Sequence, residues 1–177
     1  MNYAALKDAF KTLGYKWDDN FNIIGIRNPD YKQNTFCDIL VITSGQQVYT
    51  FPCTTRPGRH WLLNLLNSKG AAVLKAGQYV NAYRLGQHKG QPALVQVAPV
   101  TVHRDGDRDE LAEAQGVLDT GLFGINIHRA NSSVTSKLVD KWSAGCQVVA
   151  NPRDMDQILK LCRDSGKGFF TYTLLNG

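Results

Sequence analysis

The stretch from Trp142 to Gly166, WSAGCQVVANPRDMDQILKLCRDSG, places a short apolar strand directly before a helix with well-marked ends. The apolar, β-branched run CQVVA predicts the strand. The side chain of Asn151 suits the first free N–H groups of a helix, Pro152 suits the first helical position, and Gly166 suits the exit. The stretch therefore predicts a strand over 146–150 that leads into a helix.

One face of this helix is apolar, with residues at the spacing of a helix that packs on a core. These residues are Met155, Ile158, Leu159 and Cys162. Because Cys162 shares this face, we expect it to be a buried packing residue. A second amphipathic helix is predicted in MNYAALKDAFKTLGYKW, where the apolar face is formed by Tyr3, Leu6, Phe10 and Leu13.

Short strands bounded by turns are predicted outside the two helices, because alternating and β-branched residues are separated by Gly, Pro and Asn. They cover residues 21–29, 38–43, 46–53, a hairpin within 82–104 that turns at Lys89-Gly90, 121–129, 146–150 and 168–175. The expected fold class is mainly β with flanking helices (α+β). Residues 1–177 are expected to form a single domain, with the N-terminal helix and first strand in 1–35 and the core in roughly 36–177.

The composition is that of an ordinary folded globular protein, with 43% hydrophobic and 20% charged residues and a formal net charge of +5. A basic chain favours polyanionic partners. Its basic residues are scattered, however, and no nucleic-acid-reading motif is present, so we expect no nucleic acid partner. There is no signal-peptide pattern and no apolar run of about 20 residues, so we expect synthesis in the cytoplasm and no insertion into a membrane. We expect a monomer.

The sequence has four cysteines, Cys37, Cys53, Cys146 and Cys162. Their spacing fits neither a disulfide scaffold nor a zinc site, so we expect no metal and no cofactor. If 37–53 is a hairpin that turns on Ser44-Gly45-Gln46, Cys37 and Cys53 face each other, near enough to bridge or to pack as buried thiols. We expect the buried thiols.

Alternating aspartates in the loop Asp105–Glu110 are typical of some calcium sites. A calcium-binding EF-hand loop requires Gly at its sixth position and Glu at its twelfth, whereas counting from Asp105 gives Glu110 and Gly116. We therefore expect a solvated turn.

Cys146 and His128 are the residues best placed to do chemistry. Cys146 starts one predicted strand after a turn of small residues, and His128 ends an earlier predicted strand. If the two strands are neighbours, an imidazole lies near a thiol and can act as its base, and N–H groups of the turn at Gly145-Cys146 can hold an oxyanion. The residues alone leave a second reading open, in which Cys146 is only a buried packing residue.

His128, fourteen intervening residues and then Ser143-Ala144-Gly145-Cys146 resemble the active-site signature of the L,D-transpeptidase (YkuD-like) catalytic domain. VYTFPCTTRPG followed by VLKAGQY resembles an earlier paired-strand segment of that family. The similarity covers roughly residues 36–165. It implies a β-sandwich or sheet core with a helix after the Cys motif.

The resemblance also implies acyl transfer on the stem peptide of peptidoglycan. Cys146 would attack a peptide carbonyl to form a thioester, and His128 would be the base. In the family a backbone carbonyl near the Ser/Gly turn often orients the histidine, which makes Ser143 and Gly145 further site residues. Water would then release a shortened stem, whereas an amine would form a cross-link.

Two positions depart from the family pattern, because Ala144 stands where a His is usual and Val148 where an Arg or Asn is usual. We expect Arg129 to supply a replacement positive charge. Trp142, Ala144 and Tyr79 are further candidates for substrate contact, with Trp61 flanking the site. The remaining histidines are expected at the surface: His60, His88 and His103.

The function expected from this resemblance is a cysteine-dependent peptidoglycan hydrolase similar to the small wall-degrading endolysins of bacteriophages. Such an enzyme acts on the wall after another factor releases it. Three alternatives stay open: a cross-linking L,D-transpeptidase, a non-catalytic cell-wall-binding or virion module that retains the fold, and an unrelated β-rich domain.

Overall fold

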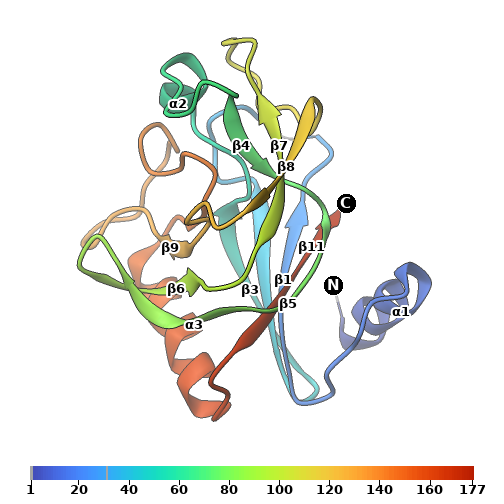
Figure 1. Cartoon of the computed structure of the whole chain (residues 1–177). Helices are drawn as coiled ribbons and strands as arrows, with labels where there is room; N and C mark the ends of the chain where they lie inside the picture. Colours follow the sequence, from blue (N-terminus) through green and yellow to red (C-terminus); the bar gives the residue numbers. More distant parts are fainter. Residues whose placement is uncertain (1, 31) are drawn as a thin grey trace.

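The computed structural model describes residues 2–30 and 32–177. Strands make up most of the regular structure, and three helices flank them (Figure 1). In chain order the elements are α1 (Tyr3–Leu13), β1 (Phe21–Arg27), β2 (Asp38–Ser44), β3 (Gln47–Thr54), α2 (Arg59–Leu63), β4 (Ala71–Leu74), β5 (Gly77–His88), β6 (Gln91–Gln96), β7 (Val100–Asp105), β8 (Val117–Gly121), β9 (Ile127–Arg129), β10 (Gln147–Val149), α3 (Pro152–Asp164) and β11 (Phe170–Asn176). The expected class, mainly β with flanking helices, is confirmed.

The main sheet closes on itself in the order β1-β11-β5-β6-β9-β10-β3-β2. A smaller sheet, β4-β7-β8, lies above it in Figure 1. Half of the neighbouring pairs in the main sheet are distant in sequence: β1-β11, β11-β5, β6-β9 and β10-β3. This order brings the ends of β5, β9 and β10 into one region. Because β1 pairs with both β2 and β11, residues before position 36 also contribute to the main sheet.

The interior of the main sheet is filled by apolar side chains from nearly every strand and from α3. Asn151 caps α3 by accepting a hydrogen bond from the N–H of Arg153, and Pro152 opens it, as the sequence predicts. The apolar face of α3 packs into this core, and Cys162 is fully buried there. The prediction of a packing role for Cys162 is confirmed.

Helix α1 lies to one side of the main sheet in Figure 1. Leu6 and Phe10 pack there against Ile24, Val41 and Leu175. Leu13 was expected on the same buried face, but it is 53% exposed. The last turn of the helix therefore extends past the surface on which the rest of it packs.

The β2–β3 hairpin has a different register from the expected one. Ser44 pairs with Gln47, so the turn has two residues, and Asp38 pairs with Cys53. The predicted opposition of Cys37 and Cys53 is therefore wrong. The cause is the positive φ of Gly45, 57°, which permits a tight two-residue turn. Cys53 is buried but Cys37 is only partly buried, and all four cysteines are free thiols.

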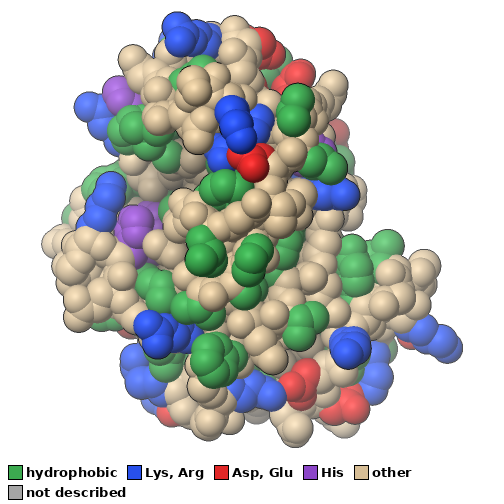
Figure 2. All heavy atoms as spheres, in the orientation of Figure 1, with side chains coloured by type: hydrophobic (Ala, Val, Ile, Leu, Met, Phe, Trp, Pro, Cys, Tyr) green, Lys and Arg blue, Asp and Glu red, His purple; other side chains and the backbone are tan. Residues whose placement is uncertain are grey.

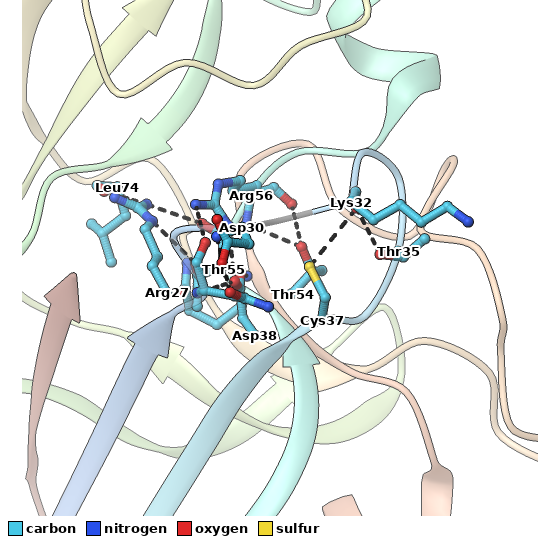
Figure 3. A network of polar contacts seen from close by, with 12 residues as sticks. Arg27, Asp30, Lys32, Thr35, Cys37, Asp38, Thr54, Thr55, Arg56 and Leu74 are labelled. Carbon is cyan, nitrogen blue, oxygen red and sulfur yellow. Dashed lines mark hydrogen bonds and ion pairs between the residues drawn. The ribbon is translucent and has the colours of Figure 1, made fainter. Parts of the chain in front are cut away.

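A buried polar network ties together the ends of β1 to β4 (Figure 3). The carboxylate of Asp38 accepts hydrogen bonds from the N–H and hydroxyl of Thr55 and pairs with the guanidinium of Arg56 at 2.8 Å. Arg27 donates to the carbonyls of Thr55 at 3.1 Å and Leu74 at 2.6 Å. These contacts connect the main sheet to the smaller sheet, at the end of the main sheet near α2.

Two segments differ from the predicted pattern because their elements are short. The predicted strand 121–129 is split, since β8 ends at Gly121 and β9 begins at Ile127, with Gly124 at a φ of 71° between them. The short elements α2 and β4 lie in the Gly/Pro-rich segment before β5. Their few residues are not enough to show a period in the sequence.

The aspartate-rich loop follows β7 directly. Asp105, its first residue, is buried, and its carboxylate accepts the N–H of Glu113, whereas residues 106–110 are exposed. The expectation of a fully solvated turn is therefore wrong at Asp105. Within residues 2–30 and 32–177, no helix has the length and apolarity needed to cross a bilayer.

Candidate functional site

Neighbouring parallel strands bring the Cys motif and the histidine together. β9 pairs with β10, and Val148 lies beside His128. Since side chains alternate along a strand, Cys146, two residues before Val148, points to the same face of the sheet as His128. The packing agrees, because Cys146 and Val148 contact Ala130, which is two residues after His128. The two strands are therefore neighbours, which is the condition on which the sequence-based hypothesis for Cys146 and His128 depends.

Cys146 and His128 line the same cavity, which has a volume of about 540 Å³. Cys146 is 9% exposed and His128 is 5% exposed, so both lie deep in it. A second cavity, of about 600 Å³, continues from the first. Six residues line both cavities: Trp61, His88, Lys89, His128, Lys141 and Trp142. We call the two cavities together the groove.

The turn before Cys146 is held by Ser143. Its buried hydroxyl donates to the carbonyl of Cys146 at 2.8 Å and accepts the N–H of Gly145 at 3.2 Å. Gly145 has a φ of 133°, and a Cβ there would lie 2.6 Å from the carbonyl oxygen of Ala72. Only glycine fits this close approach. Ser143 and Gly145 therefore shape the loop that presents the thiol.

One backbone donor of this turn has no hydrogen-bond partner among the described residues. The N–H of Gly145 is already bound by Ser143. The N–H of Cys146 donates to none of the residues that the structure describes. Of the two N–H groups expected to hold an oxyanion, only that of Cys146 is free for this role.

The orientation of His128 fixes its tautomer. Its Nδ1 lies 2.7 Å from the carbonyl oxygen of Arg129, and because a carbonyl only accepts, Nδ1 carries the proton. Nε2 of the neutral ring is then an unprotonated acceptor. It is buried and has no hydrogen-bond partner within the described chain. The carbonyl that orients the ring belongs to Arg129 and not to the Ser/Gly turn that the resemblance implies.

The thiol and the imidazole are both neutral at rest. Burial raises the pKa of the Cys146 thiol to about 11 and lowers the pKa of His128 to about 4. The Cys146 Sγ donates to the carbonyl of Gly124 at 3.3 Å. Among the described residues, no hydrogen bond joins Sγ of Cys146 to Nε2 of His128. Catalytic hydrogen bonds often form only when substrate is bound. The bond from Sγ to the carbonyl of Gly124 is therefore compatible with Cys146 as a nucleophile and His128 as its base.

A second histidine lies directly on the first. The ring of His88 stacks on that of His128, with centroids 4.2 Å apart and planes 20° apart. His88 was expected at the surface, and it is partly buried. It reaches His128 because β5 runs beside β6 and β6 beside β9. No local sequence pattern indicates the contact. His60 and His103 line neither cavity of the groove.

Two of the residues predicted to contact substrate, Trp142 and Ala144, line the groove. Trp142 is 40% exposed and lines both cavities, and Ala144 lines the first. Trp61 lines both cavities as well, and its indole N–H donates to the carbonyl of Lys141 at 3.0 Å. This bond connects α2 to the loop before the Cys motif.

The other two candidates have internal partners. Arg129 lines the second cavity but is 8% exposed, and its guanidinium pairs with Asp156 at 2.7 Å. Tyr79 lines neither cavity, and its hydroxyl lies 2.6 Å from the carbonyl of Lys75 and 3.1 Å from that of Thr101. The structure thus places Tyr79 in the packing between β5 and β7, away from Cys146.

Apart from histidines, the charged residues that line the groove are all basic: Lys89, Arg104, Arg129 and Lys141. Arg104 pairs with Asp119, as Arg129 does with Asp156. On the face shown in Figure 2, the basic side chains are scattered and form no single patch. Among the described residues, no group of three His, Cys, Asp or Glu side chains is arranged to hold a metal ion.

Comparison of the chain with protein-family models, curated proteins and solved structures finds no match.

Proposed function

We propose that this protein is a cysteine-dependent acyl-transfer enzyme that cuts the stem peptide of peptidoglycan, with a divergent L,D-transpeptidase-like core. One observation carries the proposal. Cys146 and His128 lie on one face of two paired strands and open into one cavity, and the free nitrogen of His128 is the unprotonated one.

The first half of the reaction forms a thioester. The Cys146 thiol turns from the carbonyl of Gly124 to Nε2 of His128 and transfers its proton there as sulfur attacks the peptide carbonyl carbon. The N–H of Cys146 donates to the oxyanion of the tetrahedral intermediate. The carbon–nitrogen bond then breaks, and the imidazolium returns its proton to the leaving amine.

The second half regenerates the enzyme. His128 takes a proton from water while the water oxygen attacks the thioester carbon. The carbon–sulfur bond breaks, sulfur recovers the proton, and a shortened stem with a new carboxylate leaves. The carbonyl of Arg129 stabilises the imidazolium in both halves, because it accepts the hydrogen bond from Nδ1.

The charges of the groove support an acidic peptide as substrate. The side chains of Lys89 and Lys141 are exposed and form no ion pair with an acidic residue of the described chain. They approach the site from two elements, the β5–β6 turn and the loop before Cys146. Stem peptides carry carboxylates, which two unpaired ammonium groups attract.

Hydrolysis is the favoured outcome, and cross-linking by an amine is the alternative for the same thioester. A non-catalytic wall-binding module would not need a thiol and a free imidazole nitrogen in one cavity. This pair favours catalysis over binding alone.

The proposal is tested by incubating purified protein with defined muropeptides and measuring the masses of the products by mass spectrometry. We expect shortened stems from the wild type and from Cys37→Ala, and none from Cys146→Ala. Cys37 is the matched control because it is a free thiol that lines neither cavity of the groove. Dimers would indicate cross-linking, and products that persist in Cys146→Ala would exclude Cys146 as nucleophile.

A further inference from the structure

We propose that His88 is a positioning residue for His128, fixing the plane of the imidazole that accepts the thiol proton. The role in catalysis rests on the function proposed above, whereas the role in holding the ring does not. His88 is the last residue of β5 and precedes the turn at Lys89-Gly90. It therefore reaches the site from an element outside the Cys motif.

The protonation state of His88 follows from its hydrogen bonds. The N–H of Gln96 donates to Oδ1 of Asn126 at 2.9 Å, which identifies the other end of that side chain as the NH₂ group. This NH₂ group lies 2.9 Å from Nδ1 of His88. Nδ1 must accept, so His88 is neutral and carries its proton on Nε2.

Two contacts at right angles then hold His128. The carbonyl of Arg129 binds Nδ1 in the plane of the ring. The ring of His88 covers one face, nearly parallel and 4.2 Å away. Rotation of the His128 ring out of its present plane would break the hydrogen bond and collide with His88. Nε2 is thereby kept on the side of the ring away from Arg129.

Burial favours the neutral form of both rings and lowers the pKa of both histidines. The positive charge of Lys89, which follows His88 directly, lowers both pKa values further. The guanidinium of Arg129 is paired with Asp156.

The stacking of His88 on His128 also bears on the presence of Ala144 in the Cys motif. Ala144 stands where the resembled family usually has histidine, and it lines the same cavity as His88. This chain therefore places a second imidazole at the site, but supplies it from β5. Reasoning confined to the motif finds only the loss of a histidine.

The test compares His88→Ala, His88→Phe and the control His60→Ala by nitrogen NMR of the His128 ring and by the alkylation rate of Cys146. Phe keeps a flat ring over His128, whereas Ala does not. We expect His88→Ala to give a mixture of His128 tautomers, a higher pKa of His128, and alkylation at pH 7 slower by about tenfold to a hundredfold. We expect His88→Phe and His60→Ala to stay within about threefold of the wild type.

A folded His88→Ala protein with the wild-type tautomer, pKa and alkylation rate would overturn the proposal. So would His88→Phe behaving like His88→Ala, because stacking would then not be the cause. Neither readout needs a substrate. If the wild type fails to cut muropeptides but His88→Ala still frees the ring, the proposed function fails and the positioning role stands.

Discussion

Burial shifts the pKa values of Cys146 and His128 in opposite directions, and this limits how the proposed nucleophile can be activated. The thiol has a pKa of about 11 and the imidazole one of about 4, so transfer of a proton between them in the resting groove is unfavourable. A preformed thiolate, as in many cysteine proteases, is therefore not the resting state. In the proposed mechanism, His128 therefore takes the proton as sulfur attacks.

This mechanism predicts a specific pattern of thiol reactivity. Cys162 has a pKa of about 12 and packs in the core, so it serves as an unassisted reference. At pH 7 we expect iodoacetamide to label Cys146 faster than Cys162, as measured by peptide mass. His128→Gln should slow the labelling of Cys146 by at least about tenfold, because it removes the base. Equal labelling of Cys146 in both proteins would contradict base assistance.

At the scale of elements, the sequence predicts best where the local signals are complete. Both ends of α3 are marked by Asn151, Pro152 and Gly166, and the helix forms where these residues predict it. The hairpin of β2 and β3 is also predicted, but a turn one residue shorter shifts every pair. The register depends on the backbone of Gly45, which composition does not reveal.

The junction of β1 to β4 depends on the buried carboxylate of Asp38. Its side chain is 1% exposed in the ion pair with Arg56, and it also accepts two hydrogen bonds from Thr55. Replacing it by alanine removes the acceptor of the buried Thr55 donors and the ion-pair partner of the Arg56 guanidinium. We expect Asp38→Ala to lower the free energy of unfolding by about 3–5 kcal/mol, measured by urea denaturation.

The matched control for that variant is Asp8→Ala, which changes an exposed carboxylate on α1. We expect a change within about 0.5 kcal/mol. If Asp38→Ala lowers the free energy of unfolding by no more than Asp8→Ala does, the network contributes little to the connection between the sheets.

The strand order of the main sheet brings His88, His128 and Cys146 together. The pairing of β9 with β10 could be expected from the spacing of His128 and Cys146, together with the resemblance. The approach of His88 could not, because it requires β5, β6 and β9 to be consecutive neighbours in a closed sheet. Such an order arises from packing between distant segments, and single-sequence periodicity carries no information on it.

Burial of a neutral histidine also affects stability as the pH falls. The unfolded chain protonates His128 near pH 6.5, but the folded chain does so only near pH 4, so the unfolded state binds more protons between these values. This lowers the free energy of unfolding by up to about 3 kcal/mol across that range. Asp105 acts in the opposite direction, because burial raises its folded pKa to about 6.

The contribution of His128 is therefore measured as a difference between two proteins. From pH 6.5 to pH 4, we expect the wild type to lose more stability than His128→Gln, by about 2–3 kcal/mol in urea denaturation. The Asp105 effect is common to both proteins and cancels. Parallel curves would show that His128 titrates alike in the folded and unfolded chains.

The most direct measurement of the central claim is the mass of the intact protein after brief mixing with a synthetic stem peptide and acid quenching. The account predicts a covalent adduct equal in mass to the acyl part of the stem, located on Cys146 and absent in Cys146→Ala. Turnover of the stem without any such adduct, or an adduct on another residue, would contradict it.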